Sequence, residues 1–474
     1  MSKILMVASE AAPFAKTGGL ADVIGALPGA LSARGEDVAV VLPAYREAAP
    51  FLVDATRVYT GLHLWVGGQA FIVDIRRVVR DNVQFLFVDA PPLYDRDGLY
   101  GANGVDHPDN HIRFAVLCHA ALGVIRHVFR PDLIHCHDWQ AALVAPLIRT
   151  EFALDPTFAG MKLLFTIHNL GYQGLFPATA VTDLGLDPAL FTPAALEFYG
   201  MLNLMKGGIV YSDAISTVSR RYAEEIQLPE YGFGLDGLLR ARRDVLFGIV
   251  NGVDYSEWSP ETDKYIAVNY SREDLEKKQL CKADLLKSFG LPPTNLHVPL
   301  IGIVSRFAEQ KGFDLIADIA PMLANEDIAM TIIGSGDARY ETLFQSLALA
   351  HPDRIAVQVA YDNELAHKVE AGADMFLMPS RYEPCGLNQI YSLRYGTVPI
   401  VRATGGLDDT IEKETGFKFG EYSGRALWDA VQAALATFQT PTPWIAMMKR
   451  GMGKDFSWNA SAAEYSALYR QLLG

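Results

Sequence analysis

Short apolar runs rich in Val, Ile, Leu and Phe alternate along the chain with segments whose apolar residues recur at helical spacing. In the first half these runs cover residues 4–8, 38–42, 133–136, 163–166 and 214–218. In the second half they cover residues 300–304, 330–333, 355–359, 376–378 and 398–401. Continuous apolar strands that alternate with amphipathic helices are typical of a parallel sheet covered by helices on both faces. The pattern therefore predicts two successive α/β units.

The boundary between the two predicted units coincides with a change of composition. After residues 247–254, with the sequence Phe-Gly-Ile-Val-Asn-Gly-Val-Asp, a polar and charged passage continues to Lys278. We interpret this passage as a crossover between domains and place the boundary near residue 245. The first domain is expected over residues 1–245 and the second over residues 246–455.

Two local features depart from the alternation. Residues 62–66 and 70–74 flank Gly67-Gly68, which predicts an antiparallel hairpin beside the first sheet. Near the end of the chain, Pro441-Thr-Pro443 interrupts the pattern of the second unit. A helical face then follows at positions i, i+3, i+4 and i+7, formed by Tyr465, Leu468, Tyr469 and Leu472. We expect a closing amphipathic helix.

Composition and charge exclude several classes of partner. The chain has 474 residues, of which 50% are hydrophobic and 20% are charged, an ordinary balance for a globular protein. With 41 basic and 55 acidic residues the net charge is −14, which argues against a surface that neutralises the phosphates of a nucleic acid. No apolar run reaches the roughly 20 residues that cross a bilayer, and the first predicted strand begins too early for a signal peptide. We expect a cytoplasmic protein without nucleic-acid or membrane partners.

One short motif occurs twice, each time between a strand-like run and a helical one. Thr17-Gly18-Gly19-Leu20-Ala21-Asp22 recurs as Thr404-Gly405-Gly406-Leu407-Asp408-Asp409. Glycines let a ligand approach the backbone closely, and the free N–H groups that begin a helix attract anions. Lys16 adds a positive charge beside the first copy. Taken alone, the motif fits both an anion site and a plain strand-to-helix turn.

A pair of cations follows the strand predicted at residues 300–304. Arg306 and Lys311 lie five residues apart, and Gly312 follows them. At the carboxyl end of a parallel sheet, the planar fork of an arginine and the point charge of a lysine can converge on one diphosphate. A solvated loop with surface cations is the alternative.

Polar and aromatic residues follow two further predicted strands. Asp138-Trp139 suits a sugar, because the indole offers an apolar surface and the carboxylate accepts hydrogen bonds from hydroxyl groups. His168-Asn169 occupies the same position after the next strand, and a hydrogen-bonded core histidine is the alternative for His168. His135 and His137 would share one strand face, but spacing predicts no further metal ligand, so we interpret them as core or supporting residues.

Glu383 is the best single candidate for a catalytic group. It lies in Pro379-Ser-Arg-Tyr-Glu-Pro-Cys-Gly-Leu387, after the strand predicted at residues 376–378. The proline and glycine residues fix such a turn, so the carboxylate is held in place instead of moving in solvent. Cys385 could be a nucleophile, but the sequence indicates no base for it, and a buried thiol is the alternative. The chain lacks Gly-x-Ser-x-Gly, His-Glu-x-x-His and Walker A motifs, which argues against common hydrolases, zinc peptidases and ATPases.

Together these motifs, with Val250-Asn-Gly-Val-Asp254 and in this order, resemble the bacterial glycogen synthases, which share their pattern with the plastid starch synthases. The resemblance covers nearly the whole chain. It implies the GT-B architecture, two Rossmann-like domains that face a deep cleft, with a terminal helix over residues 456–474 that crosses back to the first domain. It also implies retaining transfer of glucose from ADP-glucose to the non-reducing 4-hydroxyl of an α-1,4-glucan such as glycogen, without a metal or another cofactor.

The resemblance also assigns residues to the substrates. Those implied to bind the ADP-glucose donor are Lys16, Gly18, Gly19, Asp22, Asn251, Arg306, Lys311, Tyr361, Cys385, Gly386, Leu387, Thr404, Gly405 and Gly406. Those implied to contact the sugar or acceptor are Asp138, Trp139, His168, Asn169 and Tyr94. Those implied to take part in catalysis are Glu383, Asp138, Lys16, Arg306, Lys311 and His168. Cations from the two halves of the chain are expected to meet at one diphosphate, with Tyr361 facing the adenine.

Two departures from the family pattern bear on this prediction. Tyr391 stands eight positions after Glu383, where many related retaining transferases have a second glutamate, and this favours the glycogen and starch synthase branch. Phe307-Ala-Glu309 differs from the Leu-Thr that is usual there, but it leaves Arg306 and Lys311 intact.

Several alternatives stay open from the sequence. A UDP-sugar transferase of similar fold, such as a sucrose-synthase-like enzyme, would differ in its donor or acceptor. A dinucleotide-dependent oxidoreductase is suggested by Gly334-Ser-Gly336, which lacks the third glycine of that fingerprint. A non-catalytic glucan-binding protein would not need the diphosphate cations. The loop at residues 95–101 could contact an acceptor or be a plain turn, and the oligomeric state is not indicated.

Overall fold

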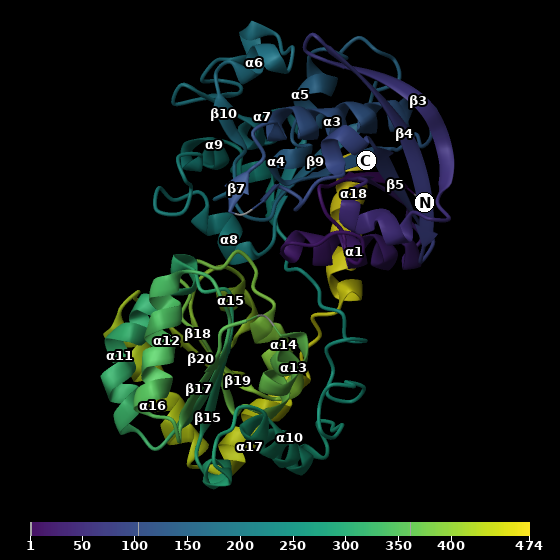
Figure 1. The fold of residues 1–474 in the computed structure, drawn as a ribbon. Helices are drawn as coiled ribbons and strands as arrows, with labels where there is room; N and C mark the ends of the chain where they lie inside the picture. Colours follow the sequence, from purple (N-terminus) through teal and green to yellow (C-terminus); the bar gives the residue numbers. More distant parts are fainter. Residues whose placement is uncertain (1, 103, 361) are drawn as a thin grey trace. The chain divides into compact units, whose positions relative to one another are not determined.

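The computed structural model describes residues 2–102, 104–360 and 362–474. The chain divides into two compact units (Figure 1). Unit 1 contains Met1–Val218, Ala223–Gly252 and Trp458–Gly474, and unit 2 contains Ser219–Tyr222 and Val253–Ser457. The chain therefore passes from one unit to the other mainly after Gly252 and after Ser457. The sequence analysis predicted these boundaries after residues 245 and 455.

Unit 1 is built on a nine-stranded sheet of order β14-β13-β9-β8-β1-β2-β5-β4-β3. Its strands are β1 (Lys3–Val7), β2 (Asp37–Pro43), β3 (Thr56–Val66), β4 (Gln69–Arg80), β5 (Val83–Asp89), β8 (Leu133–His137), β9 (Lys162–Ile167), β13 (Ala214–Thr217) and β14 (Leu246–Gly248). The strands from β14 to β5 run parallel, and β3 and β4 form an antiparallel hairpin at one edge. Both the parallel sheet and the predicted hairpin are confirmed.

Helices cover both faces of this sheet, which explains why the side chains of Ile4, Leu5, Met6 and Val7 are all completely buried. On one face α1 (Gly19–Ala33) and α18 (Trp458–Leu473) lie side by side (Figure 1). The opposite face carries α3 (Asn110–His127), α5 (Val144–Arg149) and α7 (Leu204–Tyr211). The closing amphipathic helix predicted from the sequence is confirmed as α18, which buries Tyr465, Leu468 and Tyr469.

Short elements complete unit 1. The short strands are β6 (Gly101–Ala102) with β7 (Val105–Asp106), and β10 (Leu175–Pro177) with β12 (Met201–Asn203) and β11 (Glu197–Phe198). The short helices are α2 (Pro91–Tyr94), α4 (Asp138–Ala141), α6 (Ala180–Asp183) and α9 (Asp236–Ala241), and α8 (Arg220–Glu225) includes residues assigned to both units.

Unit 2 contains a six-stranded parallel sheet of order β17-β16-β15-β18-β19-β20. Its strands are β15 (Leu300–Val304), β16 (Ala329–Ile333), β17 (Ile355–Gln358), β18 (Met375–Met378), β19 (Val398–Arg402) and β20 (Phe417–Phe419). The longer helices are α10 (Lys278–Ser288), α11 (Phe313–Asn325), α12 (Ala338–Ala350), α13 (Asn363–Gly372), α14 (Asn388–Tyr395), α16 (Gly424–Phe438) and α17 (Pro441–Met452), with the short α15 (Gly405–Thr410). The predicted α/β class is thus confirmed in both units.

One boundary differs from the sequence prediction. Pro441-Thr-Pro443 interrupts the pattern, but Pro441 also begins α17. Proline is favoured at the first position of a helix, because its missing N–H is not needed there and its φ is already helical. None of the helices in the described residues is both long and apolar enough to cross a bilayer.

Candidate functional site

Most of the predicted site residues lie at the carboxyl ends of parallel strands, where ligands bind in open α/β sheets. In unit 1 they follow β1, β8 and β9, and in unit 2 they follow β15, β18 and β19. The short connections after these strands carry the polar side chains. Each unit therefore has its own set of loops that carry predicted site residues.

In unit 2 the carboxylate of Glu383 is held by two donors. Its Oε2 accepts a hydrogen bond from Lys311 Nζ at 2.7 Å and one from Ser380 Oγ at 2.9 Å. Only 5% of Glu383 is exposed, so this ion pair is largely removed from water. The structure thus brings together two residues that the sequence singled out for different reasons. Ser380, which the sequence analysis did not single out, is the third member.

The loops around Glu383 leave no room for side chains. Gly312 has φ of +72°, and a Cβ there would overlap the carbonyl oxygen of Pro379. Gly405 has φ of +45°, and a Cβ there would overlap the carbonyl oxygen of Glu383. Gly406 donates its N–H to that same oxygen at 3.0 Å. Glycine is therefore required at these positions because three backbone segments meet beside Glu383.

The remaining predicted donor residues of unit 2 differ in exposure. Arg306 is exposed, and its guanidinium has no hydrogen-bond or ion-pair partner within the described part of the chain. Cys385 and Thr404 are buried, and Gly386 has φ of +71° before Leu387 caps the N-terminus of α14. Tyr361, predicted to face the adenine, lies outside the described residues. The four cysteines, including Cys385, are buried.

In unit 1 the loop between β1 and α1 is organised by Glu10, which the sequence analysis did not identify. Its carboxylate accepts the backbone N–H groups of Thr17 at 2.5 Å and Gly18 at 3.3 Å, and the hydroxyl of Tyr100 at 2.7 Å. Only 4% of Glu10 is exposed, and burial raises the pKa of its carboxyl although these donors act in the opposite direction. An acidic residue directly after β1 and before Lys16 is the sequence signal that could have identified it.

The exposed side of the same loop carries the predicted anion-binding groups. Lys16 Nζ forms an ion pair with Asp22 Oδ1 at 2.6 Å, and both side chains are partly exposed. Among the described residues, apart from the adjoining backbone, nothing lies within 4 Å of a Cβ placed on Gly18 or Gly19. The glycines of this first copy of the motif therefore have open space beside them, and α1 starts at Gly19 without a side-chain cap. Tyr100 also shows that the loop at residues 95–101 is tied to this site through Glu10.

Asp138 has a strained backbone and a desolvated carboxyl group. Its φ is +55°, in the left-handed region that non-glycine residues rarely adopt. Its Oδ1 accepts the backbone N–H of His168 at 2.8 Å. Burial raises the pKa of Asp138 to about 7 despite this bond. Such strain clusters at functional sites, where the surrounding structure holds it in place.

His135 and His137 of β8 and His168, which follows β9, form a chain of rings. His137 Nδ1 and His168 Nε2 are 3.0 Å apart, so one of them donates to the other. Burial lowers the pKa of His168 to about 3, and this ring is therefore neutral at pH 7. His135 lies between Tyr469 Oη at 2.9 Å and Thr166 Oγ1 at 2.5 Å. His135 and His137 are completely buried, as expected for core or supporting residues.

The indole ring of Trp139 packs closely against Phe114 and Gly174. Its ring packs edge-on against Phe114 with centroids 5.1 Å apart, and a Cβ on Gly174 would lie 2.5 Å from its Cε3. Gly174 has φ of +63°, so glycine is required beside the indole. Asn169 lies next to His168 and accepts the N–H of Gly171 at 3.0 Å.

Two predicted residues of unit 1 are buried. Tyr94 has no exposed surface, and its hydroxyl donates to the carbonyl of Arg113 at 2.8 Å, while the predicted acceptor contact stays a prediction. Asn251 is 6% exposed, and its buried Oδ1 has no hydrogen-bond partner within the described residues. An unpaired buried acceptor of this kind is costly and is consistent with a binding role.

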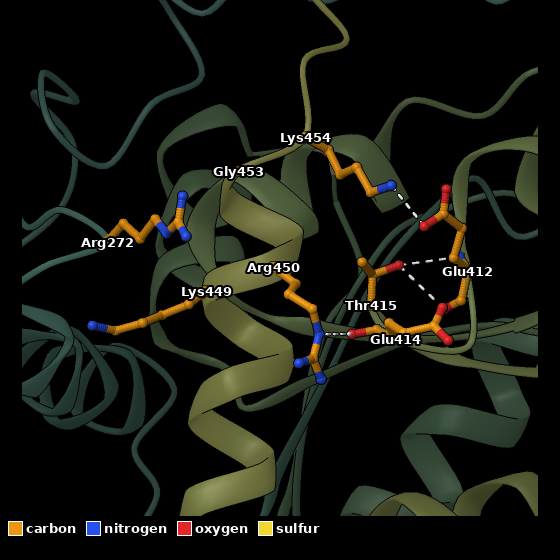
Figure 2. Close-up of a pocket in the computed structure, with 8 residues that line it drawn as sticks. All are labelled: Arg272, Glu412, Glu414, Thr415, Lys449, Arg450, Gly453 and Lys454. Atoms are coloured by element: carbon orange, nitrogen blue, oxygen red, sulfur yellow. Dashed lines mark hydrogen bonds and ion pairs between the residues drawn. The ribbon is translucent and has the colours of Figure 1, made fainter.

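A pocket of about 530 Å³ in unit 2 contains none of the predicted site residues. Figure 2 shows the side chains that line it, Arg272, Glu412, Glu414, Thr415, Lys449, Arg450, Gly453 and Lys454. Most of its cations already have partners: Lys454 pairs with Glu412 at 2.6 Å, and Arg450 Nε donates to the carbonyl of Glu414 at 3.0 Å. These contacts hold the C-terminal end of α17 in place. They give Lys454 and Arg450 partners within the protein, so these charges need no bound ligand. Within the described residues no group of His, Cys, Asp and Glu is arranged to hold a metal ion.

Comparison with known families agrees with this geometry. The family described as starch synthase catalytic domain matches residues 3–241, and the family described as glycosyl transferases group 1 matches residues 292–445. The two matches lie in the two units of the structure.

Similar proteins extend over the whole chain. A glycogen synthase of Koribacter versatilis is 54% identical over 99% of this chain and 98% of its own. Glycogen synthase 2 of Geobacter sulfurreducens is 46% identical over 99% of this chain and 98% of its own. The catalytic domain of starch synthase IV from Arabidopsis thaliana, solved with ADP and acarbose, is 30% identical and matches with a TM-score of 0.88 over 100% of this chain and 99% of that one.

A more distant structure shares the fold alone. Sucrose-phosphate synthase from Thermosynechococcus elongatus is 20% identical, with a TM-score of 0.60 over 100% of this chain and 99% of that one. The matched families are glycosyltransferases, which disfavours the oxidoreductase alternative. The resemblance in fold and in sequence is therefore confirmed, and the chain belongs to the glycogen and starch synthase family of glycosyltransferases with the GT-B fold.

Proposed function

We propose that this protein elongates glycogen by transferring glucose from ADP-glucose to the non-reducing 4-hydroxyl of an α-1,4-glucan with retention of configuration. Full-length similarity to glycogen synthases and the fold shared with a starch synthase solved with ADP support this proposal. The single structural observation that carries it is the buried Lys311–Glu383 ion pair on loops locked by glycine.

The leaving group requires positive charge. As the bond between the anomeric carbon and the diphosphate breaks, negative charge grows on the diphosphate oxygens, and fixed cations stabilise this change more than they stabilise the ground state. Arg306 is exposed and without a partner in the described residues, Lys311 ends a short turn after β15, and Lys16 precedes open glycines. We assign these three cations and the N-terminus of α1 to the donor diphosphate.

The glucosyl group becomes positively charged in the same step. We assign Glu383 to the stabilisation of an oxocarbenium-like sugar, as carboxylates do in glycoside chemistry. Its fixed position means that little reorganisation is needed during the reaction. Cys385, Gly386, Leu387, Thr404, Gly405 and Gly406 form the backbone surroundings of this group and are assigned to the donor with Asn251.

The acceptor is assigned to the residues that follow β8 and β9. Asp138 offers a carboxyl group whose pKa of about 7 lets it exchange a proton with a sugar hydroxyl near neutral pH. His168 is neutral and can donate or accept a hydrogen bond, and Trp139 supplies apolar surface. No metal or other cofactor is part of this proposal, and a cytoplasmic location is included in it.

The test is transfer of labelled glucose to glycogen from ADP-glucose and, separately, from UDP-glucose, both in excess EDTA. We expect incorporation from ADP-glucose at a higher kcat/KM than from UDP-glucose, and no loss with the chelator. A higher kcat/KM with UDP-glucose would show that the proposed donor, ADP-glucose, is wrong. Incorporation from neither donor would remove the proposed activity.

A further inference from the structure

The two carboxylate oxygens of Glu383 have different surroundings. Oε2 accepts both Lys311 Nζ and Ser380 Oγ, at 2.7 and 2.9 Å. Oε1 has no hydrogen-bond partner among the described residues. The carboxylate is thus held at one oxygen and leaves the other available to a ligand.

The two donors on Oε2 differ in how they respond to an anionic ligand. Lys311 is a mobile point charge on a four-carbon stem, and the diphosphate of a donor competes with Glu383 for it. Ser380 is neutral and 1% exposed, and only one rotatable bond separates its hydroxyl from a backbone that is itself fixed. It therefore stays on Oε2 when the ammonium group is drawn toward phosphate.

The backbone at Ser380 is fixed from both sides. The preceding residue, Pro379, has its carbonyl packed against Gly312, where a Cβ would overlap it. The following residue, Arg381, donates its N–H to the carbonyl of Gln310 at 2.8 Å. The loop that carries Lys311 thus also sets the position of the serine.

We propose that Ser380 is a positioning residue: its hydroxyl holds Oε2 of Glu383 so that Oε1 faces the reacting glucosyl group while Lys311 neutralises the diphosphate. This inference rests on the proposed glucosyltransferase function. A hydrogen bond to a charged group restrains it strongly, and a small displacement of a catalytic group can lower the rate by up to about 100-fold.

The test replaces Ser380 by Ala and measures kcat and KM for ADP-glucose. We expect kcat to fall about 10-fold while KM changes less than about twofold, because the serine acts through Glu383 and not on the donor. Ser380→Thr, which keeps the hydroxyl, should recover most of kcat.

Ser392 provides a matched control. It is a buried serine of the same unit, and its Oγ donates to Oε2 of Glu370 at 2.7 Å, a carboxyl that we assign no role in the reaction. Ser392→Ala also removes a hydrogen bond between a buried serine and a buried carboxyl group, and we expect it to lower thermal stability and to leave kcat unchanged. If both alanine variants lower kcat alike, the effect is general destabilisation and the proposal is wrong.

The outcomes separate this inference from the function on which it rests. Wild-type kcat in folded Ser380→Ala overturns the positioning role while leaving the activity intact. Absence of transfer by the wild-type chain overturns the function itself. If Ser380→Ala does not fold, Ser380→Cys decides in the same assay, since it keeps a similar shape but is a weak donor and should also lower kcat.

Discussion

The two carboxyl groups predicted to act on sugars lie in opposite electrostatic surroundings. Glu383 has a cation and a hydroxyl on one oxygen, whereas Asp138 is half-buried and has backbone N–H donors. Burial without a cation disfavours the charged form, so the pKa of Asp138 rises to about 7. Glu383 is therefore paired with Lys311, and Asp138 can change its protonation state near neutral pH.

The raised pKa of Asp138 predicts a pH dependence of stability. The unfolded carboxyl ionises near pH 4, whereas the folded one keeps its proton up to about pH 7. Between these values the folded state binds more protons, so the free energy of unfolding falls as the pH rises from about 4 to about 7. Asp138→Asn removes this contribution and should flatten the profile over that window. Urea unfolding of both proteins at several pH values measures it, and parallel profiles would contradict the assignment.

Glu383→Gln should abolish turnover without abolishing donor binding. The amide keeps the shape but loses the charge that stabilises the developing positive sugar, and we expect kcat to fall by about 10²- to 10³-fold. Lys311 keeps its charge, so the Kd for ADP measured by calorimetry should stay within a few-fold of the wild-type value. Near-normal turnover would remove Glu383 from the mechanism.

The sequence singled out residues that belong to a local motif and missed residues that are defined by a tertiary contact. Glu383 and Lys311 were singled out by their turn and spacing, but their pairing joins residues 72 positions apart. Glu10 was missed because its partners, Thr17 and Tyr100, belong to two separate loops that only the folded sheet brings together. Local patterns contain no information on such contacts.

At the scale of elements, the two copies of the Thr-Gly-Gly-Leu motif serve different needs. Both precede helices after parallel strands, as the sequence predicted. In the first copy, Gly18 and Gly19 border open space, which suits close approach of a ligand. In the second, Gly405 and Gly406 are packed against the carbonyl oxygens of Glu383 and Cys385. The same Thr-Gly-Gly-Leu sequence therefore leaves space for a ligand in unit 1 and allows close backbone packing in unit 2.

This difference predicts that one added methyl group lowers stability in the second copy of the motif more than in the first. Gly406→Ala forces a Cβ into the carbonyl of Cys385 and should lower the free energy of unfolding by about 1–3 kcal/mol and reduce kcat. Gly19→Ala has free space at the start of α1 and should change stability by less than about 1 kcal/mol, while raising KM for ADP-glucose. Chemical denaturation and steady-state kinetics measure both. Equal destabilisation by the two substitutions would contradict the packing difference.

The parallel strands were predictable because both of their faces are buried, which leaves continuous apolar runs such as residues 4–8 and 300–304. β5 (Val83–Asp89) was missed although it joins the parallel strands to the hairpin. The order of the strands was also not available, because it depends on pairing between distant segments. α17 was missed because Pro441 both ends one pattern and begins the next helix.

At the scale of the whole molecule, the last residues of the chain complete the core of unit 1. Trp458, Tyr465, Leu468 and Tyr469 are buried in one cluster with residues of β1, β2 and α1. Tyr469 also makes a hydrogen bond to His135 at the centre of the sheet. The amphipathic face was evident from spacing, but its position in unit 1 was implied only by the family resemblance.

Removal of residues 458–474 should therefore unfold unit 1 and not merely shorten the protein. The deletion exposes the apolar face of α1 and leaves His135 without one of its partners. We expect the truncated chain to lose transfer activity and the calorimetric unfolding transition of unit 1. Retention of the full unfolding enthalpy would show that the helix is dispensable for the fold.

The account as a whole states that glucose is added, in α-1,4 linkage, to the non-reducing ends of a glucan. The most direct test is to label glycogen with this enzyme and radioactive ADP-glucose and then digest the product with β-amylase, which removes maltose by cleaving α-1,4 bonds from non-reducing ends. We predict that the incorporated label is released as maltose. Label that resists digestion, or no incorporation, would contradict the proposed reaction.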